Sequence, residues 1–539
     1  MNRTAPVALA VLCLAGLPAS TTAAPARPNV VVFLADDLGY SDLGCYGSEI
    51  STPNLDRLAA NGLRFTQAYN TARCWPSRAA LLTGYYAQQV NRDPQGPRPK
   101  WAALLPDLLR PAGYRSYHSG KWHVDGPVLA GGFARSYHVT DHDRHLSPKH
   151  HQLDDRPLAP PRPGEFYYSS TAIADRAIEW IDEHAAGHKE DPFFLYVAFI
   201  SPHFPLHAPA EDIARYKGRY DAGWDAVRAG RWKRLKALGL VGGELPPPEP
   251  TLAPSWNLSP EDLARRVGPG EAARAVRWDE LTPEQKRFQS DKMAVHAAMV
   301  DRLDREVGRV LDRLKATGQY DNTLILFLSD NGGSAEQIIR GDGHRIGSVP
   351  GSAESYLGLG PGWSTVSNTP FRRHKSWTHE GGVSTPLIVQ WPEGIKEKGG
   401  IRRTPTHLVD LVPTFLDLAG LAAPETWRGE RRPALAGRSL VPAFRADLTE
   451  PRDAIFFKHT ENRGLRLGDW KIVASGEKAA WELYDLSTDR GESQDLASSR
   501  PEKLKELADL WAARDAEYAR QGATGRRPGV GKAAKAKTR

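Results

Sequence analysis

Residues 28–37 read PNVVVFLADD, and this segment sets the architecture expected for the whole chain. An unbroken run of β-branched and apolar residues is typical of a strand buried on both faces, as in the centre of a parallel sheet. Two adjacent carboxylates, Asp36 and Asp37, follow the run, and such a pair is unfavourable unless a cation neutralises it. The segment therefore predicts a central strand that ends at a charged site.

Similar segments recur along the chain and alternate with helix-like runs. The further expected strands are 113–118, 192–200, 322–328 and 385–391, and the long expected helices are 170–184 and 283–317. Alternation of this kind is typical of a mostly parallel sheet covered by helices. We therefore predict an α/β fold with a large mixed, mostly parallel sheet flanked by helices.

The pattern changes after about residue 440. Short strand-like segments lie at 454–457, 464–467, 470–474 and 481–484, and an amphipathic helix is expected at 501–520. We predict a small C-terminal α+β subdomain with an antiparallel sheet at 441–523, after a catalytic domain at 25–440. Within that domain, residues 210–282 break the alternation with three consecutive prolines and four tryptophans. They predict an insertion over the rim of the sheet, a place where ligands often bind.

The two ends of the chain have their own signals. Residues 1–24 predict a secretory signal peptide, because Arg3 precedes a short apolar run and a small-residue cleavage site follows it. We therefore expect a periplasmic or secreted protein, and no later segment is apolar enough to span a membrane. The three cysteines are Cys13, Cys45 and Cys74, so no disulfide framework is expected.

The formal net charge of +7 comes from the termini. Residues 524–539 hold six basic and no acidic side chains, Arg3 adds one more, and the rest is neutral. Proteins that bind nucleic acid carry a basic patch on a folded face. The basic segment is instead rich in Gly, Ala and Lys and predicts a disordered tail. We expect no nucleic-acid partner.

Residues 74–78 read CWPSR and lead into the helix-like run AALLTG. Pro76 suits the first helical turn, where its missing N–H costs nothing. Cys74 is therefore expected at a helix N-terminus, where free N–H groups and the helix dipole favour an anion. From these residues alone, the motif indicates a reactive cysteine at an anion site or a buried structural cysteine beside a helix cap.

Charged and polar side chains also follow or precede the other expected strands. In an open α/β sheet the carboxyl ends of the strands form the ligand site, so these side chains are expected to converge. The oxygen donors favour Ca²⁺ or Mg²⁺ over zinc. The basic residues suit a tetrahedral anion and proton transfer. The oxygen donors are Asp36, Asp37, Asp330 and Asn331, and the basic residues are Lys121, His123, His203 and Lys375.

The pattern C-x-P-S-R-x-x-x-L-T-G at 74–84 resembles the signature of type I, formylglycine-dependent sulfatases, and the chain is similar to their bacterial arylsulfatase members. The resemblance runs from about Pro28 to Leu496. It implies an alkaline-phosphatase-like fold and the hydrolysis of aryl or carbohydrate sulfate monoesters. It rests also on NLDRL at 54–58, GKWH at 120–123, PHFP at 202–205, DNGG at 330–333 and GDWK at 468–471.

The resemblance implies a role for each of these residues. A maturation enzyme would oxidise Cys74 to formylglycine (3-oxoalanine), whose hydrate is the nucleophile and which Arg78 steadies. Ca²⁺, with Mg²⁺ as second choice, would be held by Asp36, Asp37, Asp330, Asn331 and the modified Cys74. Lys121, His123, His203 and Lys375 would contact the sulfate of a sulfated small molecule or glycan. His203, alone or with Lys375, is the expected acid, and His123 the expected base.

The sequence departs from the family pattern in one segment, and three alternative functions stay open. Residues 376–379 are bulkier than the family's usual run, so they are expected to alter the outer wall of the sulfate pocket. A phosphonate monoester or phosphodiester hydrolase of the same superfamily has a similar sequence. A non-catalytic sulfated-glycan-binding protein is a second alternative, which the intact Cys74 motif disfavours. A two-zinc phosphatase is a third, disfavoured because no histidine-rich zinc sets are apparent.

Overall fold

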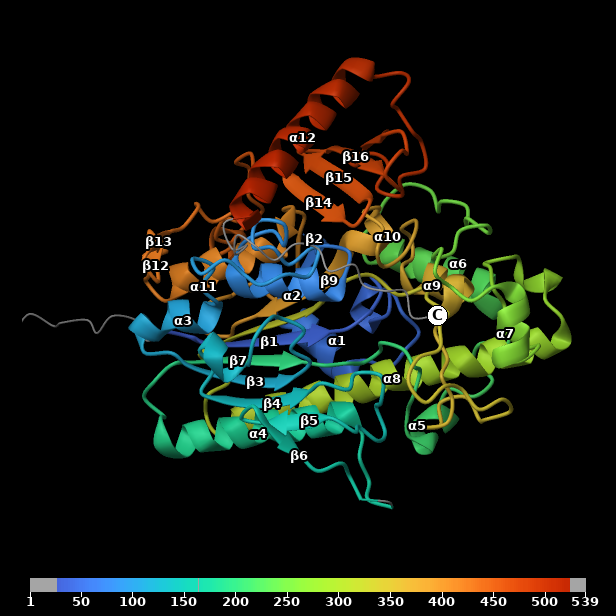
Figure 1. Ribbon diagram of the computed structural model, residues 1–539, viewed down its shortest axis with the longest axis horizontal. Coiled ribbons are helices and arrows are strands. Elements are labelled where there is room, and N and C mark those ends of the chain that lie inside the picture. Colours follow the sequence, from blue (N-terminus) through green and yellow to red (C-terminus); the bar gives the residue numbers. More distant parts are fainter. Residues whose placement is uncertain (1–26, 163, 524–539) are drawn as a thin grey trace, which may run out of the picture.

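The computed structural model describes residues 27–162 and 164–523, so the predicted signal peptide and basic tail lie outside the described residues. At its centre is an eleven-stranded sheet with the strand order β10-β2-β9-β8-β1-β7-β3-β4-β5-β6, and β11 pairs with β2 (Figure 1). The strands are β1 (Asn29–Ala35), β2 (Leu63–Tyr69), β3 (Arg115–Gly120), β4 (Arg135–Val139), β5 (His151–Leu153), β6 (Arg156–Leu158), β7 (Phe193–Ala198), β8 (Thr323–Ser329), β9 (Ser384–Gln390), β10 (Gly400–Arg402) and β11 (Thr406–His407).

The central strands run parallel, with one exception that matters for the site. β1 pairs in parallel with β7 and β8, and β3 pairs in parallel with β7. β9, expected from residues 385–391, runs antiparallel to both β8 and β2. The amino end of β9 therefore lies beside the carboxyl end of β8. This direction brings the segment before β9, which carries Lys375, to the edge where β1 and β8 end.

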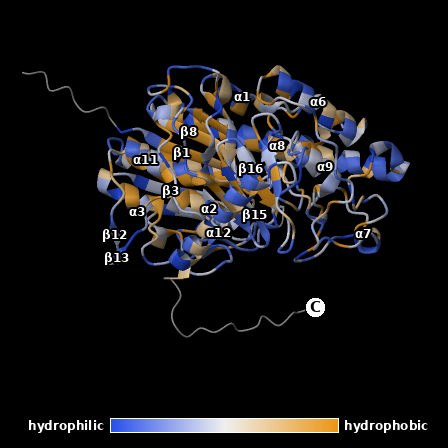
Figure 2. Ribbon diagram, turned by 90° about the horizontal axis from the view of Figure 1, so that it is seen from above, coloured by the Kyte–Doolittle hydropathy of each residue, from blue (hydrophilic) through white to orange (hydrophobic). Residues whose placement is uncertain are grey.

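β1 is buried on both faces, as its sequence predicts. Val31 and Phe33 pack into the cluster that includes side chains of α4 (Ser169–Gly187) and α8 (Pro283–Ala316). Val30, Val32 and Leu34 pack into a second cluster, on the other face of the sheet. Figure 2 shows the hydrophobic strands in the middle of the molecule. The helices of the second face include α2 (Cys74–Thr83), α3 (Leu105–Leu109) and α11 (Leu411–Leu418) (Figure 1).

The predicted insertion contains helices of its own. They are α5 (Ala210–Ala214), α6 (Gly223–Ala237) and α7 (Pro260–Arg266). Trp224 and Trp278 pack edge to face against Trp363 of α9 (Gly360–Ser367) and belong to the main hydrophobic core. Trp256 differs, because 47% of its surface stays exposed. Part of the insertion therefore packs into the hydrophobic core, whereas the ring of Trp256 lies partly exposed at the surface.

The C-terminal region forms a second sheet, as expected. β14 (Ile455–His459), β15 (Asn462–Leu467), β16 (Trp470–Ala474) and β17 (Glu482–Asp485) are antiparallel, and α12 (Pro501–Ala523) packs on them (Figure 1). Lys471 of β16 is fully buried and lies 2.8 Å from both Glu380 and Glu492. Glu380 begins α10 (Glu380–Val383), so this ion cluster joins the two sheets. The predicted fold class is confirmed.

The remaining short elements complete the described chain. α1 (Pro53–Ala60) packs on α8, and β12 (Thr426–Trp427) pairs with β13 (Glu430–Arg431). Within residues 27–162 and 164–523, no helix combines the length and apolar character needed to cross a bilayer.

Candidate active site

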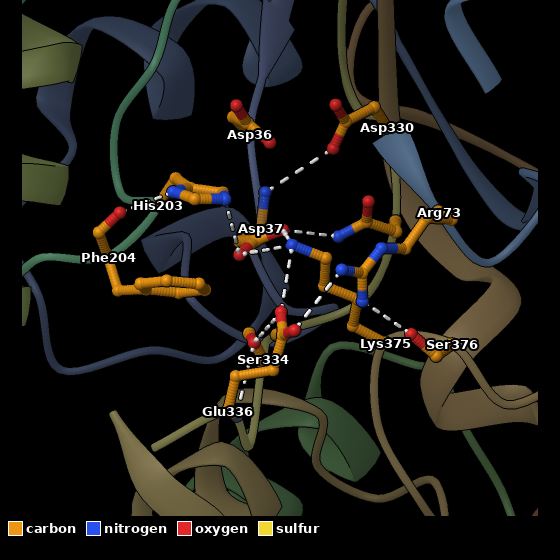
Figure 3. Close-up of polar contacts among 12 residues, drawn as sticks. Asp36, Asp37, Arg73, His203, Phe204, Asp330, Ser334, Glu336, Lys375 and Ser376 are labelled. Atoms are coloured by element: carbon orange, nitrogen blue, oxygen red, sulfur yellow. Dashed lines mark hydrogen bonds and ion pairs between the residues drawn. The ribbon is translucent and has the colours of Figure 1, made fainter. Parts of the chain in front are cut away.

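The acidic residues that follow β1 and β8 meet at the edge of the sheet. Asp36 and Asp37 continue directly from β1, and Asp37 has a left-handed backbone with φ 66°. Its N–H donates to Asp330 Oδ1 at 3.3 Å, and the Asn331 amide donates to Asp37 Oδ1 at 2.7 Å. Figure 3 shows Asp36, Asp37 and Asp330 close together. The structure thus brings together the four oxygen donors predicted from sequence.

Each of the three aspartates is paired with a cation that the sequence also singled out. Lys121 Nζ lies 2.5 Å from Asp36 Oδ2. The Arg78 guanidinium donates from Nε and Nη2 to Asp330 Oδ2, at 3.0 and 2.8 Å. Lys375 Nζ lies 2.7 Å from Asp37 Oδ1, and Figure 3 draws this contact. These side chains are almost fully buried, so the charges compensate one another inside the protein rather than through water.

The surroundings shift the pKa values of the three carboxyl groups in different directions. Burial raises the pKa of Asp36, but Lys121, His203 and Arg78 together hold it well below its ordinary value. Burial raises the pKa of Asp37 despite the neighbouring Lys375. Burial and the charge of Asp36 raise the pKa of Asp330 to about 7, against the effect of Arg78. The raised pKa values of Asp37 and Asp330 mean that additional positive charge at the site would favour their ionised forms.

Cys74 is the first residue of α2, as its motif predicts. The residue is only 3% exposed, and Arg78 comes from the same helix one turn later. Burial raises the pKa of the Cys74 thiol, although Lys121 and Lys375 act in the opposite direction. The unmodified side chain is therefore a neutral thiol at pH 7, and a thiol is a weak nucleophile.

Three imidazoles line the same site, one more than the sequence predicts. His203 Nε2 lies 3.8 Å from Asp37 Oδ2. The His142 ring packs between His203 and His123, with ring centres 5.8 and 5.5 Å apart. Burial lowers the pKa of all three, and Lys375 adds to the effect on His203 while Lys121 adds to it on His123 and His142. His142 was missed because it follows no predicted strand.

Glu336 is a second residue that sequence reasoning missed. Its Oε2 lies 3.4 Å from Lys375 Nζ, and its Oε1 lies 3.1 Å from Arg73 Nη2 (Figure 3). Burial opposes ionisation of Glu336, but Lys375 and Arg73 lower its pKa to about 2. The available signal was a carboxylate soon after the DNGG turn at 330–333. Glu336 and Asp37 together hold Lys375 in place.

The segment at 376–379 divides between the site and the C-terminal sheet, because Ser376 Oγ accepts a hydrogen bond from Arg73 Nη1 while the three bulkier side chains contact the sheet. The Trp377 indole donates to Ser475 Oγ at 2.9 Å, and Thr378 Oγ1 donates to the carbonyl of Arg463. His379 Nε2 lies 3.2 Å from Glu482. These side chains contact the C-terminal sheet and its flanking turn. Their size therefore serves the contact between the sheets.

The donor set fits a divalent cation. Asp36 Oδ1 and Asn331 Oδ1 are buried acceptors with no hydrogen-bond partner among the described residues. Buried acceptors of this kind are normally satisfied, and a metal ion satisfies them directly. Asp36, Asp37 and His203 each have a ligand atom within 4.8 Å of the others. The nitrogen of His203 is a poor ligand for Ca²⁺ or Mg²⁺, so the oxygen donors are the better match.

The comparisons with known proteins agree with this geometry. The family model for sulfatases matches residues 28–421, and a model for the C-terminal part of N-sulphoglucosamine sulphohydrolase matches residues 372–512. The first match covers more than half of the chain. The chain therefore belongs to the sulfatase family.

Similar proteins come from Schizosaccharomyces pombe and from Klebsiella aerogenes. The chain is 32% identical to sulfatase PB10D8.02c of Schizosaccharomyces pombe, over 91% of this chain and 94% of that protein. It is 32% identical to an arylsulfatase of Klebsiella aerogenes, over 78% of this chain and 92% of that enzyme. The solved structure of Ps i-CgsB with k-i-k-neocarrahexaose aligns with a TM-score of 0.64 at 25% identity, covering 92% of this chain and 94% of that one.

Proposed function

We propose that this sulfatase hydrolyses aryl or carbohydrate sulfate monoesters with a formylglycine made from Cys74. The observation that carries the proposal is the position of Cys74. It begins α2 beside a buried cluster in which Lys121, Lys375 and Arg78 are held by carboxylates. A neutral buried thiol is a poor nucleophile, whereas a hydrated formylglycine supplies one hydroxyl to attack sulfur and a second whose deprotonation releases sulfate.

The chain's own cations bind the sulfate and stabilise the charge that grows on it. Lys121 and Lys375 are fixed by Asp36 and Asp37, so little reorganisation is needed when the anion arrives. Arg78, fixed by Asp330, lies next to the nucleophile on the same helix. A divalent cation held by the four oxygen donors would supply further positive charge against the sulfate oxygens. We propose Ca²⁺, with Mg²⁺ as second choice, because all four donors are oxygens.

The imidazoles are the proposed proton carriers. An alcohol is a poor leaving group, so the S–O bond breaks more easily if the departing oxygen receives a proton. We assign this proton to His203 and assign the removal of the second hydroxyl proton to His123. Burial and Lys375 lower the pKa of His203. The negative charge of a bound sulfate ester would raise this pKa and favour the protonated form.

Replacement of His203 by alanine tests this assignment. The loss should be small for 4-nitrophenyl sulfate, whose leaving group needs no proton, and about 10²–10⁴-fold for a sugar sulfate. Lys121→Ala should instead slow both substrates by a similar factor, because Lys121 contacts the sulfate that they share. The measurement is kcat/KM for a series of leaving groups of different pKa. An equal loss across the series for His203→Ala would remove His203 as the acid and leave Lys375 as the candidate.

A substrate panel tests the proposed function itself. The purified enzyme, matured in the presence of a formylglycine-generating enzyme, is assayed on 4-nitrophenyl sulfate, several sulfated glycans, a phosphonate monoester and a phosphodiester. We expect sulfate monoesters to give the highest kcat/KM. A higher kcat/KM for the phosphorus esters would assign the chain to the other hydrolase activity of the superfamily. The proposed location is periplasmic or secreted, and processing at residue 24 is checked by N-terminal sequencing.

A further inference from the structure

The insertion places one aromatic ring close to the sulfate-binding lysine. Trp256 lies between α6 and α7, and its indole N–H donates to Glu336 Oε1 at 2.9 Å. The other oxygen of Glu336 lies 3.4 Å from Lys375 Nζ. The carboxylate of Glu336 thus connects the Trp256 indole with Lys375. The ring remains 47% exposed, unlike the buried Trp224 and Trp278 of the same insertion.

A cation packs against this ring from the side of the nucleophile. The Arg73 guanidinium lies 5.9 Å from the centre of the Trp256 ring and 5.4 Å from that of Trp75. Because Arg73 directly precedes Cys74 in sequence, Trp256 contacts a residue next to the proposed nucleophile. Hydrogen bonds from Arg73 to Glu336 and Ser376 hold the guanidinium in place. The Trp256 ring is therefore held in a fixed position at the rim.

A second cation lies at the rim, beside the proposed acid. Arg340 is exposed, and its guanidinium lies 5.5 Å from the centre of the Phe204 ring, next to His203. Within residues 27–162 and 164–523, the Arg340 side chain has neither an ion pair nor a hydrogen bond to another residue. Arg345, in the same loop, is paired with Glu354. Among the described residues, Arg340 therefore offers a guanidinium without a hydrogen-bonded partner, a group well suited to carboxylates and sulfates.

We propose that Trp256 and Arg340 form a subsite for the leaving group, and that this subsite takes an acidic carbohydrate. The C–H face of a sugar ring would stack on the exposed indole, whose π face is negative. A carboxylate or a second sulfate on the same glycan would pair with Arg340. An isolated aryl sulfate offers no such second anion. The inference rests on the proposed function and adds to it the class of substrate.

The test compares two sulfated disaccharides with inorganic sulfate as an inhibitor. One disaccharide joins N-acetylglucosamine 6-sulfate to a uronic acid, and the other joins it to neutral galactose. Trp256→Ala should raise KM about 3–10-fold for both, the range expected for losing one aromatic contact. Trp256→Phe, which keeps a ring but loses the bond to Glu336, should raise KM less. Arg340→Gln should raise KM for the acidic disaccharide alone, and the Ki of sulfate should stay unchanged in all three variants.

Two substitutions in the same segments serve as matched controls. Trp232, which packs under Lys236, and Arg345 are replaced by alanine and glutamine, and neither change should alter KM. An equal effect of Trp256→Ala on both disaccharides and on the Ki of sulfate would overturn the subsite. It would show that Trp256 acts through Glu336 and Lys375. Unchanged KM values in both the Trp256→Ala and Arg340→Gln variants would also overturn it.

Binding measurements separate this inference from the proposed function. Calorimetry on the inactive Cys74→Ala protein should show tighter binding of the acidic disaccharide, and this preference should be lost with Arg340→Gln. Turnover of 4-nitrophenyl sulfate without binding of either disaccharide would overturn the subsite and leave the proposed function standing. Binding with the expected dependence on Trp256 and Arg340, but no turnover of any sulfate ester, would contradict the proposed function and leave the subsite standing.

Discussion

Replacing Cys74 by alanine will abolish sulfate ester hydrolysis and leave the protein folded. We expect a loss of at least about 10⁴-fold in kcat, the scale seen when a covalent nucleophile is removed. Folding should be retained because alanine is a good residue for the first turn of α2 and the thiol forms no disulfide. The measurements are kcat on 4-nitrophenyl sulfate and the thermal unfolding midpoint.

Cys45 provides the matched control for this substitution. It is also a buried free cysteine, but its backbone N–H bonds to Asp56 far from the proposed nucleophile's helix. Cys45→Ala should keep most of the activity. Peptide mass spectrometry of active enzyme should show formylglycine at position 74 and an unmodified thiol at position 45. Full activity in protein that carries only unmodified Cys74 would contradict the proposed nucleophile.

Replacing Asp330 by alanine will remove bound metal and activity together. The change deletes one of four oxygen donors and leaves the buried Arg78 without its closest partner. Removing one member of a buried ion pair typically costs about 3–5 kcal/mol of folding stability. We therefore expect a lower unfolding midpoint, a sub-stoichiometric content of calcium or magnesium, and activity below detection. Elemental analysis and thermal unfolding are the measurements.

Asp330→Asn separates loss of charge from loss of volume. Asparagine keeps an oxygen near the metal position and fills the same space, but it cannot neutralise Arg78. We expect weaker metal binding that high calcium partly restores, with activity recovering in parallel. Stoichiometric zinc in the wild-type enzyme, without calcium or magnesium, would contradict the assigned cation. Full activity after complete removal of metal by chelation would contradict the role of the ion.

The centre of the fold is readable from sequence because its signals are local. The run at 28–34 predicts β1, and its position between two parallel neighbours follows from the same apolar pattern. Asp36, Asp37 and Asp330 are predicted because they directly follow strands, and the carboxyl ends of parallel strands share one edge. Cys74 is predicted because its neighbours form a motif.

The other features of the sheet and of the site depend on contacts between residues far apart in the sequence, which no local pattern encodes. Strand direction is one example, since nothing in residues 385–391 indicates that β9 runs against β8. Glu336 and Trp256 are another, because their contact joins two loops whose conformations are set by distant packing. His142 lies in an irregular segment, so its position between two other imidazoles depends on tertiary structure alone.

The ion cluster around Lys471 has a consequence for how the chain is made. Glu380 is synthesised about ninety residues before Lys471, its counter-ion in the folded protein. Until that lysine leaves the ribosome, α10 cannot be buried without isolating a carboxylate, which is costly. We therefore expect a chain that ends before β16 to fold incompletely and to be cleaved by proteases faster than the full chain.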